Sequence, residues 1–370
     1  MARYKARIDE IAAPHLRAMV KYVYLNLNID SLMSERWQEI LDMVLATLQT
    51  IIVTRAPGSV AKDILYDDTG ALLVYPKLRE LRLDVGGDRK RKSEADFERP
   101  DYVPFPVLAQ VSVGPGDPHI SKLLLRGNRE SLVHIRLCLS GRTVTRLHNA
   151  GVLDGDEAWP ALRHIELYRP ALGMESDQYG DGRGSLSRVM FGQLVRWVLT
   201  TARDCPRIVL RGWRMELHLG AGELEPLVAR LGSTVRHLDL PVVCTVADAL
   251  GLVKRLPNLD YLGIALDGCM MSGDDIPADE YVRTAVAAQQ SRLRTLAVQV
   301  DNEAGVLQQR QIALACALAK MTPSAQTLES RCAFREVGSS APVLEALSHA
   351  AEAVRAGLAV KPYTAYPQWQ

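Results

Sequence analysis

A short pattern of apolar positions recurs along this chain: apolar residues occupy the first, fourth and sixth places of a six-residue stretch, with mostly polar residues between them. The copies are LRELRL from Leu78, LAQVSV from Leu108, LVHIRL from Leu132, LRHIEL from Leu162, VRHLDL from Val235, LDYLGI from Leu259 and LRTLAV from Leu293. Such alternation is typical of strands with one buried face. The pattern predicts strands over residues 78–85, 107–113, 132–139, 161–168, 235–240, 259–266 and 293–300.

Two looser copies are VKYVYL from Val20 and LRGWRM from Leu210. Four copies also share a lead-in, YPKL, FPVL, WPAL and LPNL, in which a proline stands two residues before the first apolar place. Proline fixes φ and lacks an N–H donor, so it suits a turn that leads into a strand. The recurrence indicates one structural unit repeated along the chain.

Segments between the strand motifs have helical periodicity. They are SERWQEILDMVLATLQTI (34–51), SLSRVMFGQLVRWVLTTAR (185–203), GELEPLVARLG (222–232), VADALGLVKRL (246–256), DEYVRTAVAAQQ (279–290), QQRQIALACALAKM (308–321) and APVLEALSHAAEAVRAGL (341–358). Alternating strands and helices predict an α/β fold with a parallel sheet. The short repeat period favours a solenoid with the sheet on its concave side and helices on its convex side.

The strand motif resembles that of leucine-rich-repeat proteins over roughly residues 70–335. The irregular repeat lengths and helical outer segments are similar to the repeats of F-box-type members. The resemblance implies a horseshoe that presents substrates to a ubiquitin ligase. The family has Asn or Cys eight residues after the first leucine, where this chain has Gly86, Gly116, Ser140, Pro170, Val243, Asp267 and Asp301. No F-box is recognisable, so a ligase adaptor is expected as a partner only if an F-box lies upstream.

We expect three regions: an N-terminal helical cap with the first strand (1–60), the irregular repeat array (61–340), and a C-terminal capping helix and tail (341–370). Three long loops follow strand motifs directly. In a parallel array these loops share one rim, where they either form a binding surface or are only tolerated insertions. Their sequences are DVGGDRKRKSEADFERPDYVP, YRPALGMESDQYGDGRGS and LDGCMMSGDDIPADE.

Composition limits the classes of function. Lys plus Arg number 44 and Asp plus Glu 43, so no global field attracts nucleic acid or an anionic membrane. The six cysteines are scattered without CxxC spacing, which indicates buried thiols in a reducing compartment. No apolar run is long enough for a membrane span. We expect a cytoplasmic protein, or a nuclear one if the basic run RKRK (89–92) acts as an import signal.

The sequence carries no recognisable signature of an enzyme or of a cofactor site. GAGELE (220–225) lacks the third glycine of a dinucleotide fingerprint and indicates a turn before a helix. GxSxG, HExxH, P-loop and EF-hand motifs are absent from the sequence. His134, His164 and His237 share the third place of the motif, which favours a surface ladder over a metal site. We expect a non-enzymatic protein without cofactor or metal.

The strand register points to a binding face. If the first, fourth and sixth places face the core, the second, third and fifth form the concave face. Its expected partner-binding residues are Arg79, Arg82, His134, Arg136, Arg163, His164, Arg211, Arg214, Arg236, His237, Tyr261 and Arg294. Arg and Tyr are enriched at binding hot spots. We expect a protein partner with an acidic segment; the alternative is a nucleic-acid or phosphate ligand, which would need more stacking aromatics.

Overall fold

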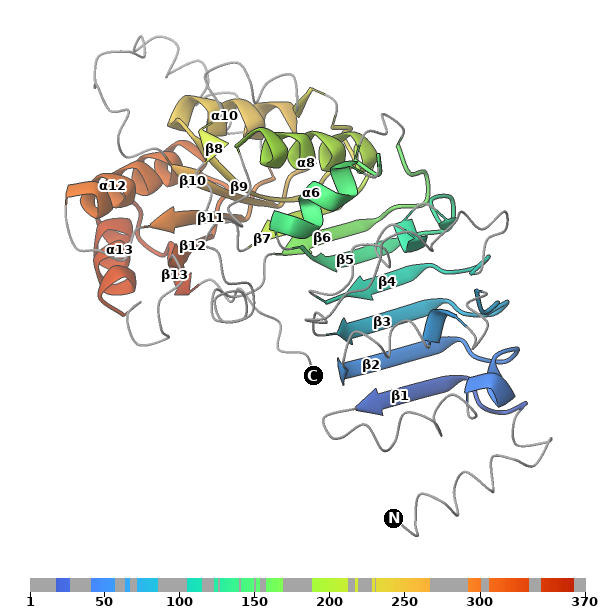
Figure 1. The fold of residues 1–370 in the computed structure, drawn as a ribbon. Coiled ribbons are helices and arrows are strands. Elements are labelled where there is room, and N and C mark those ends of the chain that lie inside the picture. Colours follow the sequence, from blue (N-terminus) through green and yellow to red (C-terminus); the bar gives the residue numbers. More distant parts are fainter. Residues whose placement is uncertain are drawn as a thin grey trace. The chain divides into compact units, whose positions relative to one another are not determined.

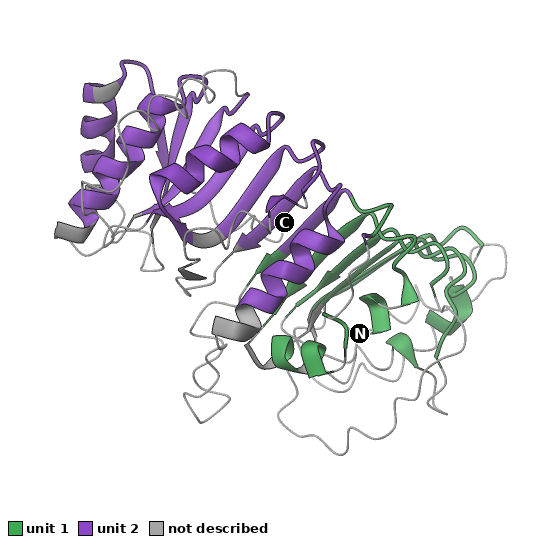
Figure 2. Cartoon of the chain, turned by 90° about the horizontal axis from the view of Figure 1, so that it is seen from above, with its two compact units in different colours: residues 1–155, 159–162, 167–190 green, residues 156–158, 163–166, 191–370 purple. Residues whose placement is uncertain are grey.

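The computed structural model contains an α/β fold whose strands form one parallel sheet (Figure 1). The structure describes residues 18–26, 41–56, 64–66, 72–85, 105–114, 123–125, 127–139, 141–149, 151–153, 158–168, 188–211, 217–218, 228–229, 231–266, 292–300, 306–332 and 341–362. The chain divides into two compact units (Figure 2). Unit 1 comprises residues 1–155, 159–162 and 167–190, and unit 2 comprises 156–158, 163–166 and 191–370.

The strands follow one another in the sheet in the order in which they occur in the chain, β1-β2-β3-β4-β5-β6-β7-β9-β10-β11-β12-β13, and β8 pairs with β9. Their bounds are β1 Tyr22–Asn26, β2 Thr50–Ala56, β3 Glu80–Val85, β4 Gln110–Val113, β5 His134–Cys138, β6 His164–Tyr168, β7 Arg207–Arg211, β8 Leu217–His218, β9 His237–Cys244, β10 Tyr261–Leu266, β11 Thr295–Val300, β12 Thr327–Cys332 and β13 Ala359–Pro362. Apart from β8, which pairs only with β9, the strands therefore pair in the order in which they follow one another in the chain. The predicted α/β class and parallel sheet are confirmed.

All seven predicted strands are present, and each begins at or after the third place of its motif. The second place therefore precedes the strand. The looser copy from Val20 is confirmed as β1. The copy predicted from Leu210 has the wrong register. Strand β7 pairs Arg207 with His237 and Ile208 with Leu238, so the first apolar place of this copy is Cys205.

Strands β2, β12 and β13 were not predicted. In β2, LQTIIV obeys the pattern from Leu48, but its apolar residues also continue the helical period of the preceding segment. Residues 41–44 are helical and residues 45–47 turn, so a helix over 34–51 is wrong at its C-terminal end. In β12 the first apolar place is Ala325, and the small side chain concealed the repeat.

A backbone ladder marks the place where the strands begin. The carbonyl at the second place of one copy accepts bonds from the N–H groups at the second and third places of the next. Thus Arg294 N and Thr295 N donate to Asp260 O at 2.8 and 3.0 Å, and the same pair of bonds links Arg236 with residues 260 and 261. These bonds hold successive copies in one register and leave the side chains of the second place outside the ladder.

The lead-in proline lies in a tight turn. The N–H of the first apolar place donates to the carbonyl three residues earlier, as from Leu78 to Tyr75 and from Leu108 to Phe105. Proline occupies the second position of this turn, where its fixed φ is suited. The aromatic residue before it is buried in unit 1, where the rings of Tyr75 and Phe105 stack at 5.6 Å.

Side chains of these turns bond to the turn of the preceding copy. Thr47 Oγ1 donates to Val20 O at 2.8 Å, Ser131 Oγ to Leu108 O at 2.8 Å and Asn258 Nδ2 to Ser233 O at 2.8 Å. These bonds join the turns ahead of the strands.

Each unit has a core made of rows of apolar side chains that run across its strands. In unit 1 the fourth-place row is Ile51, Leu81, Val111 and Ile135, in direct register. In unit 2 the corresponding row is Ile208, Leu238, Leu262, Leu296 and Leu328. All of these side chains are buried. The predicted burial of Leu81, Ile135, Ile165, Leu238, Leu262 and Leu296 is confirmed.

The described helices are α6 Gly141–Asn149, α8 Arg188–Thr201, α10 Val246–Arg255, α12 Val306–Met321 and α13 Ala341–Val354. Helix α10 begins with a capping box, in which Thr245 Oγ1 accepts from Asp248 N and the Asp248 carboxylate accepts from Thr245 N. In unit 2, α10, α12 and α13 pack against strands β10 to β13 (Figure 1). The helix expected over 341–358 is present as α13, but it ends at Val354, and the strand β13 follows it and pairs with β12.

Some expectations fall outside the described residues. These are the helix over 279–290, the larger part of the helix over 222–232, the RKRK run, and most of the three long loops.

Candidate functional site

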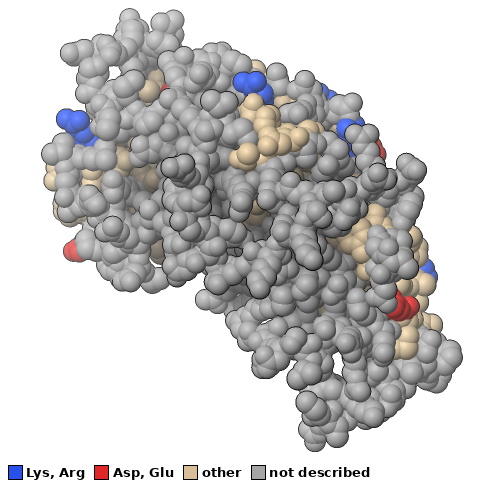
Figure 3. Space-filling model, viewed as in Figure 1, with Lys and Arg blue, Asp and Glu red and all other residues tan. Residues whose placement is uncertain are grey.

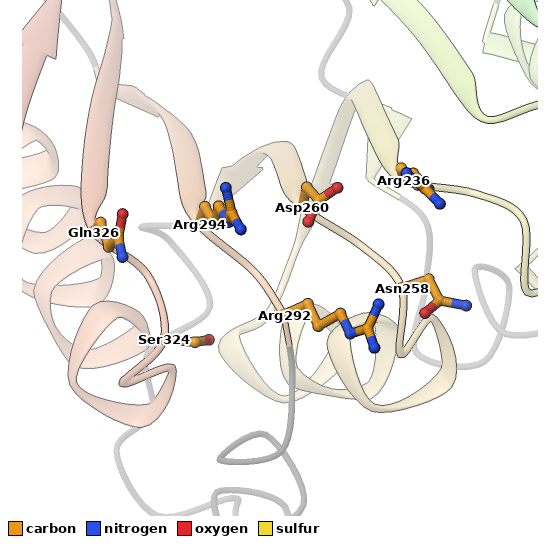
Figure 4. Close-up of a pocket in the computed structure, with 7 residues that line it drawn as sticks. All are labelled: Arg236, Asn258, Asp260, Arg292, Arg294, Ser324 and Gln326. Carbon is orange, nitrogen blue, oxygen red and sulfur yellow. The ribbon is translucent and has the colours of Figure 1, made fainter.

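A groove in unit 2 lies where strands β9 to β12 begin (Figure 4). Its volume is about 660 Å³, and its lining is mostly polar. The lining residues are Arg236, Asn258, Asp260, Arg292, Arg294, Ser324 and Gln326. All come from the turns that lead into the strands, so the repeated fold places them side by side.

The lining residues form two rows (Figure 4). The first row holds the second place of each copy: Arg236, Asp260, Arg294 and Gln326. The second row comes from two residues earlier in each turn: Asn258, Arg292 and Ser324. Adjacent strands lie about 4.8 Å apart, so successive members of a row are separated by roughly that distance at the backbone.

Three guanidinium groups and one carboxylate give the groove a positive charge. Arg236, Arg292 and Arg294 are exposed, and Asp260 is partly exposed. Within the described residues, none of these four side chains makes an ion pair or a side-chain hydrogen bond. The groove thus presents several hydrogen-bond donors that can receive an anionic group without first breaking an internal pair.

The expected concave-face residues separate into two sets. Arg79, Arg163, Arg236 and Arg294 occupy the second place, ahead of the strands, and are exposed. The expectation that they decorate the strand face is therefore wrong, because the strand begins one residue later. Arg82, His134, Arg136, His164, His237 and Tyr261 do lie on strands. Arg211 ends β7, opposite the strand starts, and Arg214 lies outside the described residues.

In unit 1, two of the expected arginines, Arg82 and Arg136, lie on strands and already have partners. Arg82 Nε pairs with Glu80 Oε1 at 2.5 Å, and the Arg136 guanidinium lies 5.2 Å from the centre of the Tyr168 ring. These interactions partly balance the positive charges of the two guanidinium groups. The strand face of unit 1 is therefore a weaker candidate for anion binding than the groove of unit 2.

In unit 2, the strand face carries carboxylates and aromatic rings. The His237 and Tyr261 rings stack at 4.0 Å with an interplanar angle of 8°, and Tyr261 Oη donates to Glu329 Oε2 at 3.1 Å. His164 Nε2 lies 3.9 Å from Glu166 Oε2. Glu166 and Asp239, expected at the exposed fifth place, are buried. Several side chains of this face are therefore engaged in internal contacts.

The sequence contained a signal for the groove residues that were missed. Asn258 and Ser324 directly follow the lead-in prolines of LPNL and TPSA, and Arg292 occupies the equivalent position of its copy. Residues after this proline line the groove because the turn directs them to the edge of the sheet. Gln326 was missed together with β12.

Four buried cysteines, Cys138, Cys205, Cys244 and Cys316, are free thiols, as expected from their apolar surroundings. Burial raises the pKa of Cys205 from 9.0 to about 11, although bonds to backbone groups and the charge of Arg163 oppose the shift. Burial also raises the pKa of Cys244, and Asp248 adds to this effect.

The Cys205 shift predicts a loss of stability at alkaline pH. The unfolded thiol ionises near pH 9 and the folded thiol near pH 11, so the stabilisation is present below pH 9 and is lost as pH rises through 11. Between pH 8 and pH 11, the free energy of unfolding of the wild type relative to Cys205→Ala should fall by about 2 kcal/mol. Urea denaturation at each pH measures it. If the difference in free energy of unfolding between the wild type and Cys205→Ala is the same at both pH values, the pKa of Cys205 is not raised by folding.

The described residues were also considered as a metal site and as membrane-spanning helices. No group of three or more His, Cys, Asp or Glu side chains there is arranged to hold a metal ion. None of the described helices is long and apolar enough to cross a membrane. On the face shown in Figure 3, the described Lys and Arg side chains stand apart from one another.

The chain was compared with known proteins. No family model matches it, and no curated protein matches it. The assignment of function therefore depends on the groove itself.

Proposed function

We propose that this chain is a non-enzymatic protein-interaction module, built as a leucine-rich-repeat-like solenoid, and that the unit 2 groove binds an acidic segment of a protein partner. The observation that carries the proposal is the group of three arginines, Arg236, Arg292 and Arg294, without ion pairs among the described residues and exposed along one groove. Support for the solenoid comes from the sequential parallel strands and the repeated turn bonds.

An acidic peptide suits this groove for two reasons. Each guanidinium can form two parallel hydrogen bonds with a carboxylate, which adds geometric selectivity to charge attraction. The lining residues also belong to successive copies of the motif, so that an extended segment can cross several of them. One role for such a module is the recognition arm of a ubiquitin ligase. That role is supported only by the resemblance of the strand motif to the leucine-rich-repeat family.

Nucleic acid is the less favoured ligand. Single-stranded nucleic acid is usually held by a cationic groove together with aromatic side chains on which bases stack. The residues that line this groove include no aromatic side chain. Asp260, in the middle of the first row, would also repel a continuous phosphate backbone.

Selection from a displayed library of random peptides tests the proposal. The wild type should enrich peptides that contain several Asp or Glu residues, and added salt should weaken their binding because the charges are exposed. The variant Arg236→Glu with Arg294→Glu should bind the enriched peptides at least about tenfold more weakly, since like charges then face each other.

The matched control is Arg196→Glu with Arg310→Glu. Both residues are exposed on unit 2 helices, α8 and α12, so the control changes net charge equally without altering the groove. Circular dichroism should show that both variants are folded. Equal binding by the two variants, or a wild-type selection without acidic enrichment, would overturn the proposal.

A further inference from the structure

We infer that Asp260 makes the groove selective for an alternating pattern of charge, in which two acidic side chains of the bound segment flank a hydrogen-bond donor such as lysine. This inference rests on the proposed function and adds a specificity-determining residue to it. A groove that only collected anions would not need a carboxylate at the centre of its row.

The position of Asp260 follows from the register of the strands. Arg236, Asp260 and Arg294 precede β9, β10 and β11, which are adjacent in the sheet. The two arginines therefore flank Asp260, one strand away on each side, and are separated by about 10 Å at the backbone. Figure 4 shows the three side chains in this order.

An extended peptide can match this order. Its side chains alternate between two faces, so residues i, i+2 and i+4 lie on one face. Each of them is about 6.6 Å from the next. Arginine side chains are long and can span the difference of about 2 Å per step from the strand spacing. An acidic residue at i meets Arg236, a donor at i+2 meets Asp260, and an acidic residue at i+4 meets Arg294.

Side chains, rather than the backbone, must read this pattern. The backbone N–H groups of residues 236, 260 and 294 already donate to the preceding copy, at 2.9, 2.7 and 2.8 Å. These N–H groups therefore cannot donate a hydrogen bond to the peptide. When the acidic residues at i and i+4 of the peptide pair with Arg236 and Arg294, residue i+2 of the peptide faces the Asp260 carboxylate. An acidic side chain at i+2 is therefore repelled.

Three synthetic peptides test the inference. They share the sequence Gly-Glu-Gly-X-Gly-Glu-Gly, with X as Lys, Gln or Glu, and their binding is measured by fluorescence anisotropy at low ionic strength. The wild type should bind the Lys peptide about fivefold more tightly than the Glu peptide. Asp260→Asn should reduce this ratio by about two- to fivefold, and Asp260→Arg should reverse the order of affinity.

The two claims fail in different ways. If the wild type binds every peptide no better than Arg236→Glu with Arg294→Glu does, the proposed function itself is overturned. If the double variant loses binding but the ratio of Lys to Glu affinity is the same in the wild type and in Asp260→Asn, only the role of Asp260 is overturned. Circular dichroism of the Asp260 variants confirms that the fold is kept.

Discussion

Replacement of Leu238 by alanine should lower the free energy of unfolding by about 2–5 kcal/mol. Leu238 is fully buried in β9, where it lies in register with Ile208 of β7 and Leu262 of β10. Removal of its side chain opens a cavity in the middle of a row, and both neighbours lose contacts. Urea denaturation followed by circular dichroism measures the change.

The matched control for Leu238 is Gln326→Ala, in the same unit but on an exposed turn. It should change the free energy of unfolding by less than about 0.5 kcal/mol. A loss at Leu238 as small as that of the control would mean that the register of the unit 2 core is wrong.

Phe105→Ala should have a comparable effect in unit 1, about 3–5 kcal/mol. The Phe105 ring is fully buried in the lead-in turn before β4 and stacks on Tyr75 at 5.6 Å. Its removal costs both apolar burial and the ring contact. Tyr75 is itself anchored, because its hydroxyl donates to Ile64 O at 2.5 Å.

Val107→Ala provides the comparison for Phe105. Val107 lies two residues along the same turn and is 43% exposed, so its truncation should be nearly neutral. The same denaturation experiment distinguishes the two variants. Equal losses at the two positions would show that the aromatic residue of the lead-in does not anchor the turn.

Much of the sheet could be predicted from the sequence because three apolar places recur with a fixed offset. That pattern reports burial directly, since the first, fourth and sixth places face the core. It failed where burial was ambiguous. The segment around Leu48 satisfies both helical and strand periods, and Ala325 is too small to stand out as a core position.

The residues that line the groove were predicted less well. Alternation along a strand locates side chains only within the strand, and Arg236 and Arg294 lie one residue before it. Their exposure depends on the lead-in turn, whose geometry the apolar pattern does not encode. Asn258 and Ser324 were missed for the same reason, although the proline before each marked the turn.

Photo-crosslinking shows whether an acidic segment lies along the groove of unit 2. A selected acidic peptide with a photoreactive residue between its acids is irradiated with the wild type, and the adducts are mapped by mass spectrometry. We expect adducts in the turns around residues 236, 258–260, 292–294 and 324–326, and these adducts should be lost when excess unlabelled peptide is added. If competed adducts are found only on other surfaces of the chain, the acidic segment does not lie along the groove.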